Sequence, residues 1–260
     1  MKNFIIAFRT ELIKLKRSVI FPATLIFFVF VPSMMALLMW VARNPDAAAK
    51  LGMVGTKASL FGQSDWNGYL GLLLQGLASI GMIGFGFVAA WVFGREYMDK
   101  TMKDMLALPV SRSAIVMAKF ALILIWSILL TIIMFIAGIS MGFAVGVQGW
   151  AAANFSAFSI TFFRVAFLTI LVSFPVAFFA CYGRGIVAPI SFVIIALIIA
   201  NFAGLVGVGS WFPWAIPGLL TIAEPTAGMI LTPASFVILG LTSATGVAAT
   251  LLWWRHADHK

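Results

Sequence analysis

Residues 120–139 read FALILIWSILLTIIMFIAGI, an unbroken run without a charged side chain. A helix needs about 20 apolar residues to cross the roughly 30 Å hydrocarbon core of a bilayer. The whole chain has the same character: its 260 residues are 63% hydrophobic and only 10% charged, against about 25% charged in soluble domains. The composition therefore excludes a water-soluble enzyme, a disordered chain and a disulfide-stapled secreted domain.

Five further runs of this kind predict an all-α membrane protein with six transmembrane helices in a single domain, residues 1–260. Such long runs exclude an outer-membrane barrel, whose strands alternate in hydrophobicity. Prolines in or beside the spans are tolerable because neighbouring helices can satisfy the freed carbonyls. The predicted helices are Val19–Val41, Tyr69–Phe93, Val116–Val145 (expected to end near Met141), Phe158–Tyr182, Ile186–Val206 and Ala234–Trp254.

The basic residues are distributed unevenly between the two sides of this bundle. Because Lys and Arg in short loops favour the cytoplasmic side, we expect both termini to be cytoplasmic. The net charge of +9 then reflects topology and anionic lipid rather than nucleic-acid binding. The predicted cytoplasmic residues are Lys2, Arg9, Lys14, Lys16, Arg17, Arg95, Lys100, Lys103, Arg112, Lys119, Arg184, Arg255 and Lys260, and the predicted outer ones are Arg43, Lys50, Lys57 and Arg164.

Residues 3–17 are predicted to form an amphipathic helix that lies on the membrane surface. Its apolar positions recur at spacings of three and four, as on one helix face: Ile5, Phe8, Leu12 and Leu15. Thr10, Lys14 and Arg17 are expected to point away from that face. A basic flank that only sets topology is the alternative interpretation.

Residues 94–113, GREYMDKTMKDMLALPVSRS, concentrate charge between the second and third spans. Methionines recur there at helical spacing, Pro109 would end the helix, and Ser111 could cap the third span. A short helix with mixed charges and adaptable methionines suits docking to a soluble partner, although a solvated loop helix without a partner is equally compatible. The candidate partner-coupling residues are Glu96, Asp99, Lys100, Lys103, Met105, Leu106, Pro109 and Arg112.

The segment 207–232 is apolar but rich in Gly and Pro, which predicts short helices dipping into the outer leaflet. Irregular backbone survives at membrane depth only against protein or a watery cavity. Candidate residues for an outer gate or substrate path are Arg164, Trp211, Trp214 and Glu224. Interfacial anchoring is the alternative role for the two tryptophans, and snorkelling to the interface is the alternative for Arg164.

The sequence lacks the residues that most membrane enzymes and pumps require. It contains no Gly-x-x-x-x-Gly-Lys-Ser/Thr phosphate loop, and no carboxylate lies within a predicted span, as a proton relay would need. Its two histidines, His256 and His259, stand in the last five residues, so no metal site is expected. A Gly-x-x-x-Gly ridge at Gly138, Gly142 and Gly146 fits close packing within one chain or across a dimer.

The chain resembles, over essentially its full length, the permease subunits of ABC transporters of the ABC-two exporter class. The resemblance rests on the surface helix Phe8–Arg17, the pattern from Phe93-Gly-Arg-Glu-Tyr to Pro109-Val-Ser-Arg112 and Ala118-Lys119, and Trp211-Phe-Pro-Trp-Ala-Ile-Pro217. Size and the last string look most like small permeases of the bacitracin and lantibiotic-immunity type.

This resemblance implies a transport subunit in the bacterial cytoplasmic membrane, without catalysis of its own. ATP and magnesium would be bound by a separate nucleotide-binding subunit seated on residues 94–113, which would contain the coupling helix. A second permease chain, identical or related, would help to enclose the path of an amphiphilic substrate such as a peptide antibiotic or lipid-like drug. The alternatives are a membrane anchor or assembly factor that does not transport and, less favoured, an intramembrane enzyme.

Overall fold

The computed structural model describes residues 2–44, 65–102, 105, 110–222 and 229–256. Among these residues, six helices are long and apolar enough to cross a membrane, which confirms the prediction of six spans. The third reaches Ala144, slightly beyond the expected end near Met141. The helices are α2 (Ile20–Arg43), α5 (Trp66–Met98), α7 (Arg112–Ala144), α8 (Phe155–Tyr182), α9 (Val187–Val206) and α11 (Pro233–His256).

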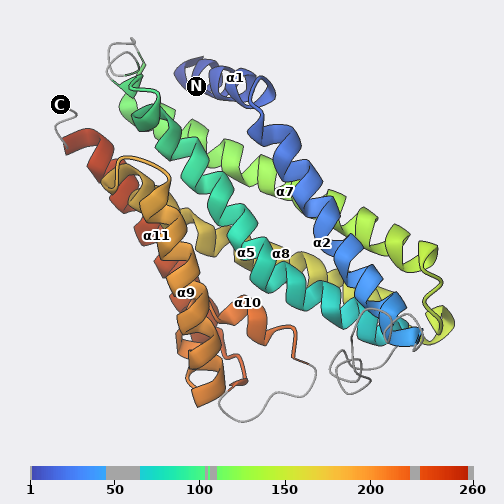
Figure 1. Cartoon of the computed structure of the whole chain (residues 1–260). Coiled ribbons are helices and arrows are strands. Elements are labelled where there is room, and N and C mark those ends of the chain that lie inside the picture. The colour runs from blue at the N-terminus through green and yellow to red at the C-terminus, as the bar shows by residue number, and fades with distance from the viewer. Residues whose placement is uncertain (1, 45–64, 103–104, 106–109, 223–228, 257–260) are drawn as a thin grey trace.

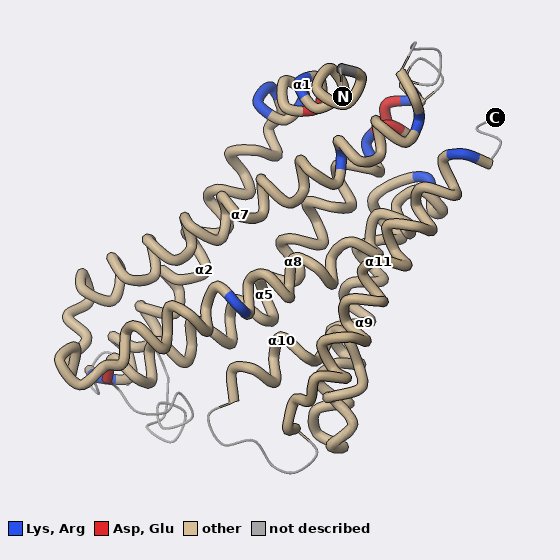
Figure 2. Tube along the Cα trace, turned by 180° about the vertical axis from the view of Figure 1, so that it is seen from behind, with Lys and Arg blue, Asp and Glu red and all other residues tan. Residues whose placement is uncertain are grey.

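Shorter helices lie at the two ends of the bundle. Helix α1 (Lys2–Lys16) crosses the end where the C-terminal residues of α11 also lie (Figure 1). Basic positions gather at this end (Figure 2), which we call the basic end; the opposite end is the distal end. The distal end carries η2 (Trp150–Ala152), η3 (Gly209–Trp211) and α10 (Ile216–Leu219). The segment 207–232 thus contains short helices, as expected, and its residues 223–228 lie outside the described part.

Helix α5 is the centre of the bundle and packs against α2, α7, α8 and α9. Glycines allow two of its neighbours to approach closely. A Cβ on Gly84 would lie 2.5 Å from the Phe28 ring of α2, and one on Gly86 would lie 2.6 Å from Val193 of α9. Toward the distal end α9 then diverges from α5, with α10 between them (Figure 1).

The Gly-x-x-x-Gly ridge is used inside the chain. A Cβ on Gly138 would meet Leu73, and a Cβ on Gly142 would meet the rings of Trp66 and Tyr69. The hydroxyl of Tyr69 also donates a 2.7 Å hydrogen bond to the carbonyl of Gly138. These two glycines therefore join α7 to α5 rather than supplying a free dimer seam.

Helices α8 and α11 pack closely against each other at Pro175 of α8. Pro175 has no N–H for the carbonyl of Leu171, one turn earlier, and that carbonyl instead accepts a 2.9 Å hydrogen bond from Ser243 of α11. Close by, a Cβ on Gly246 would lie 2.6 Å from the Cα of Pro175. The neighbouring helix therefore satisfies the backbone group that the proline frees, as the sequence predicted.

The face of α1 that packs against protein includes a carboxylate as well as apolar residues. Ala7, Glu11 and Leu15 are buried, Phe8 and Leu12 are partly buried, and Ile5 is 48% exposed. Lys14, expected to point away, instead pairs with Glu96 of α5. The reason is that α1 packs on α7 and is paired with the end of α5 through Lys14 and Glu96, so its inner face is set by protein contacts as well as by lipid.

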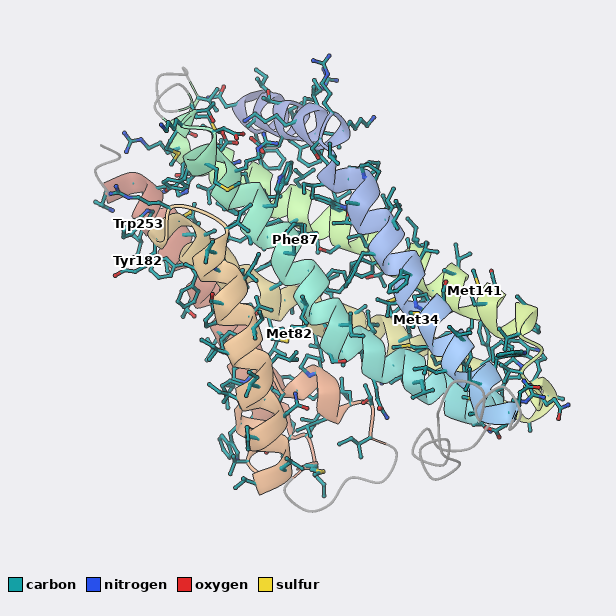
Figure 3. The ribbon with its side chains drawn as sticks, viewed as in Figure 1. Met34, Met82, Phe87, Met141, Tyr182 and Trp253 are labelled. Carbon is teal, nitrogen blue, oxygen red and sulfur yellow. The ribbon has the colours of Figure 1, made fainter. Side chains whose placement is uncertain are left out.

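Large apolar side chains cover the outside of the bundle. Figure 3 shows carbon-rich side chains projecting along α9 and α2, whereas Met82 lies between α5 and α9 and is 2% exposed. At the basic end, Tyr182 and Trp253 lie side by side with ring centroids 5.6 Å apart (Figure 3). Aromatic residues of this kind are common at the membrane–water interface, and an apolar exterior is what lipid contact requires.

Candidate coupling cluster and substrate groove

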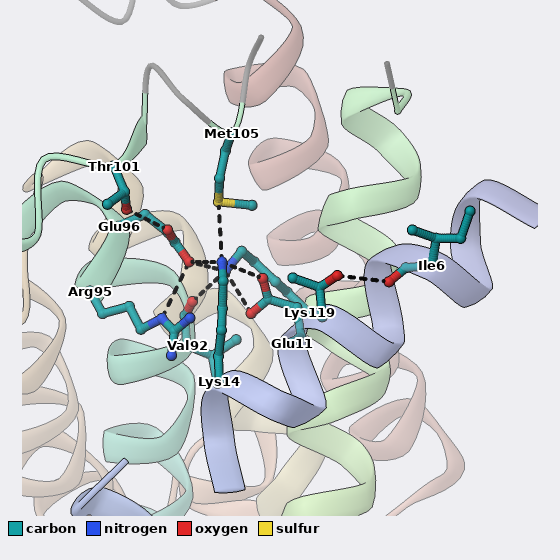
Figure 4. A network of polar contacts seen from close by, with 10 residues as sticks. Ile6, Glu11, Lys14, Val92, Arg95, Glu96, Thr101, Met105 and Lys119 are labelled. Atoms are coloured by element: carbon teal, nitrogen blue, oxygen red, sulfur yellow. Dashed lines mark hydrogen bonds and ion pairs between the residues drawn. The ribbon is translucent and has the colours of Figure 1, made fainter. Parts of the chain in front are cut away.

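A cluster of charged side chains is buried where α1, α5 and α7 meet at the basic end (Figure 4). Helix α5 contributes Glu96 from its last turn, and α7 contributes Lys119 from its second. Glu96 is 2% exposed and Lys119 is 0% exposed. Their charged atoms lie 3.1 Å apart, so an ion pair joins two transmembrane helices beneath the surface of the molecule.

Helix α1 completes the cluster with one charge of each sign. Glu11, 3% exposed, binds Lys119 at 3.0 Å through one carboxylate oxygen and Lys14 at 3.1 Å through the other. Lys14 also binds Glu96 at 3.0 Å. Two carboxylates and two ammonium groups thus alternate around a closed circuit of ion pairs. We call these four residues the coupling cluster.

Additional donors and acceptors satisfy the rest of the cluster. Lys119 donates to the carbonyl of Val92 at 2.9 Å, and Thr101 donates to the second oxygen of Glu96 at 2.8 Å. Arg95 lies 3.3 Å from Glu96 and 4.7 Å above the ring of Trp91. Burying charges costs several kcal/mol each unless geometry and hydrogen bonds compensate. Because each charge here has several partners, the side chains are held in one arrangement, and removing any one of them is expected to destabilise the protein strongly.

The predicted partner-coupling residues are divided between this interior and the surface. Glu96 and Met105 are buried, and the sulfur of Met105 lies 3.7 Å from Nζ of Lys14. Asp99 and Lys100 are exposed in the turn that follows α5, where Lys100 has a φ of 56°. The remaining predicted residues of this stretch, Lys103, Leu106 and Pro109, lie outside the described residues.

Arg112 is exposed and lies apart from the turn after α5. It donates to the carbonyls of Trp254 and Arg255, at 3.2 and 3.3 Å, and so ties the start of α7 to the end of α11. Ser111 caps α7 as the sequence predicted, by accepting a hydrogen bond from the amide of Ala114. A cavity of about 350 Å³ opens between α1 and the turn after α5, and the four-residue cluster forms part of its wall through Glu11, Lys14 and Glu96.

A second hollow lies in the distal half of the bundle, between α5, α9 and α10. It has a volume of about 370 Å³. Gln75 and Ser79 of α5 face Asn201 of α9 across it, and apolar side chains such as Leu197 and Trp214 complete the wall. No Lys, Arg, Asp or Glu is among its described lining residues. We call this hollow the distal groove.

The predicted outer residues do not form one site. Trp214 lines the distal groove and donates from Nε1 to the carbonyl of Val172 at 3.1 Å. Trp211 is 67% exposed. Arg164 is exposed on α8, which does not line the groove, and Glu224 lies outside the described residues. Of the four, the structure places only Trp214 in the groove wall.

Comparison with known proteins identifies the family. The sequence model described as "ABC-2 family transporter protein" matches residues 7–201. This range includes α1 from Ala7 onward, the coupling cluster and most of α9. The chain belongs to the ABC-2 transporter family. It is therefore an ABC transporter permease, a multi-pass protein of the bacterial cell membrane.

One curated relative of this ABC-2 permease is the Bacitracin transport permease protein BCRB of Bacillus licheniformis. It is 30% identical over 200 residues, which cover 75% of this chain and 90% of the relative. Family membership implies association with an ATP-binding subunit and another permease chain, and a role in transport rather than catalysis.

Sequence reasoning identified only Glu96 of the four cluster residues as a candidate site and missed Glu11, Lys14 and Lys119. Lys119 was assigned only to topology and to the family pattern, although a lysine inside a predicted apolar span is itself a sign of a special role. Glu11 offered a weaker signal, because carboxylates are common on surface helices. Gln75 and Asn201, polar residues within predicted spans, were also overlooked.

Proposed function

We propose that this permease exports an amphiphilic substrate using ATP hydrolysed by a separate subunit bound at its basic end. The basic end would then be cytoplasmic, in agreement with its concentration of Lys and Arg. ATP and magnesium would be held by that subunit and not by this chain. The exposed turn at Asp99 and Lys100 would contact the subunit together with neighbouring residues of the segment 94–113.

The observation that carries this proposal is the position of the turn directly beside the coupling cluster. Thr101, in the turn, donates to Glu96, and Glu96 is bound to Lys14 of α1 and Lys119 of α7. A displacement of the turn would therefore move α1, α5 and α7 together. Glu96, being buried, would act by positioning these helices rather than by touching the partner.

The distal groove supports a substrate that combines apolar surface with uncharged hydrogen-bonding groups. Gln75 and Asn201 can each donate and accept hydrogen bonds, while Leu197 and Trp214 offer apolar contact. Peptide-like amphiphiles have this chemistry, and the named relative is a bacitracin transport permease. We therefore assign the groove to the substrate path.

A second permease chain would close this path. Polar side chains such as Gln75 and Asn201, both exposed on transmembrane helices, are unfavourable against lipid and favourable against protein or a watery cavity. Closed two-fold dimers are the commonest assemblies among soluble homo-oligomers. The α5–α9 side would then face the second chain, identical or related.

The test is ATPase activity of the purified permease with the ATP-binding subunit expressed alongside it. Asp99→Ala combined with Lys100→Asn should weaken binding of the subunit and lower transport-linked ATPase activity, while the permease stays folded. Asn suits the positive φ of Lys100. The matched control is Arg9→Ala with Lys16→Ala, which removes two exposed charges from α1 at the same end.

Equal loss of activity in both double variants would contradict a specific role for the turn. Normal binding of the subunit without ATP-dependent movement of any amphiphile would instead favour the anchor or assembly role. In a second arm, Gln75→Leu should impair transport while subunit binding persists, and Ser140→Leu on the exposed face of α7 should leave transport unchanged.

A further inference from the structure

Arg164 occupies an unusual place for a charged residue. It lies on α8 about 14 Å along the helix axis from Phe155 and about 27 Å from Tyr182, at 1.5 Å per residue. The helix is about 42 Å long, whereas the hydrocarbon core is roughly 30 Å thick. If α8 is centred in the bilayer, whether upright or tilted, the backbone at Arg164 lies within the hydrocarbon layer on the distal side.

The surroundings of Arg164 on this face are apolar. Ile160, Phe163 and Phe167 are 54%, 45% and 55% exposed and follow the same side of α8 at helical spacing. Among the described residues, Arg164 has no ion pair or side-chain hydrogen bond, and the described helices α7, α8 and α11 contain no Asp or Glu. The guanidinium is thus a lone cation in an apolar stripe.

The neighbouring helices leave this stripe open. Helices α7 and α11 meet at the basic end, where Arg112 donates to Trp254 and Arg255 donates to Ser113. Seen from behind, they diverge toward the distal end with α8 between them (Figure 2). Lipid of the distal leaflet can therefore reach the stripe from the side.

The positive charge of Arg164 determines which kind of molecule can cover this face of α8. An exposed arginine at this depth is unfavourable unless it finds a counter-charge. A second copy packed here across a two-fold axis would bury Arg164 of both subunits in one interface, because such interfaces use the same patch on both subunits, and the described part of this face offers no carboxylate to pair with either. A phosphate at the lipid interface supplies the missing anion, accepts two parallel N–H bonds from a guanidinium, and lies within reach of a snorkelling side chain.

We propose that Arg164, with Phe163 and Phe167 beside it, binds the phosphate group of a phospholipid in the distal leaflet. The acyl chains lie along the apolar stripe of α8, and the guanidinium extends toward the interface to hold the phosphate. This assignment does not depend on the direction of transport or on the identity of the transported substrate. It separates the lipid-binding face at α8 from the α5–α9 face assigned to the second chain.

The experiment uses the full-length chain in nanodiscs with a photoactivatable phosphatidylglycerol and a diacylglycerol probe carrying the same acyl chains without phosphate. The phosphate probe should cross-link to residues 155–182, and Arg164→Leu should reduce that yield about tenfold at subsaturating probe, as expected for losing a charge-assisted hydrogen bond. Arg164→Lys should retain most of it. Arg9→Leu, which removes an exposed arginine from α1, is the matched control and should leave the cross-linking yield unchanged.

Three results would overturn the proposal. The first is equal cross-linking of α8 by both probes. The second is an unchanged yield in Arg164→Leu, with folding verified by size-exclusion chromatography. The third is efficient disulfide formation between two chains carrying Phe163→Cys in a Cys181→Ala background, which would show that protein covers this face.

Discussion

Glu11 and Lys119 are joined by a 3.0 Å ion pair although 108 residues separate them in the chain. One stands on the helix across the end of the bundle and the other on a transmembrane helix, and both side chains are buried. The pair therefore fixes the position of α1 relative to α7. Since α1 also reaches α5 through Lys14 and Glu96, the three helices form one mechanical unit.

Lys119→Met should lower the free energy of unfolding by about 3–5 kcal/mol, since it leaves buried carboxylates without a partner. Unfolding in mixed micelles, followed by circular dichroism, measures the change. Lys16→Met, which removes an exposed lysine from α1, is the control and should change stability little. Adding Glu11→Leu to Lys119→Met should recover part of the loss, because both ends of the pair are then apolar. A larger loss in the double variant would contradict the assigned pairing.

Gly246→Val should destabilise the protein by about 1–3 kcal/mol through overpacking. The added side chain would meet the backbone of Pro175 on α8, with a Cβ only 2.6 Å from its Cα, and backbone cannot rotate away. The control is Gly240→Val on the same helix, where a Cβ meets nothing within 4 Å. Thermal unfolding of both variants in one detergent separates packing from helix propensity; equal stability of the two would argue against the α8–α11 contact.

Ser243→Ala should cost about 0.6 kcal/mol, a typical value for a hydrogen bond between transmembrane helices. Its hydroxyl donates a hydrogen bond to the Leu171 carbonyl, which has no helical partner because Pro175 lacks an N–H. In a Pro175→Ala background the residue at 175 regains its N–H, so Ser243→Ala should then cost almost nothing. Thr242→Ala, whose hydroxyl binds only its own helix at Ile238, should show the same effect in both backgrounds. A double-mutant cycle tests this, and strict additivity for Ser243 would refute it.

Trp214→Phe should lower stability by about 1 kcal/mol, the usual net worth of one hydrogen bond, because the Nε1 bond to Val172 is lost. Trp211→Phe should be close to neutral, since that side chain is 67% exposed. Chemical unfolding of the two variants gives the comparison. A greater effect at Trp211 would indicate a packed role for it that the single chain lacks.

The proposed orientation predicts opposite labelling of the two ends. In a Cys181→Ala background, Asp99→Cys in the exposed turn should react with a membrane-impermeant maleimide only after cells are permeabilised. Val208→Cys, at the distal end and 52% exposed in its native form, should react in intact cells. Reversal of this pattern would place the basic end outside and remove the basis for an ATP-binding subunit there.

Much of the fold could be predicted because lipid imposes one strong rule on sequence. Every span must be apolar over about 20 residues, so runs such as Val116–Val145 were found within a few residues of α7. Helix α1 was expected at 3–17 and observed at Lys2–Lys16. Its inward face was less predictable, because periodicity ranks positions by hydrophobicity and so favoured Ile5 over Glu11.

The sequence by itself determined that the chain is embedded in a lipid bilayer and crosses it six times. It also showed a charged segment directly before the third span. Only the tertiary structure decided that Glu11, Lys14, Glu96 and Lys119 share one buried circuit, and that Gln75 and Asn201 face one groove. The physical reason is the separation along the chain over which each interaction acts. Partition into a bilayer acts on each segment separately, whereas a charge pair between distant residues exists only after the helices have packed.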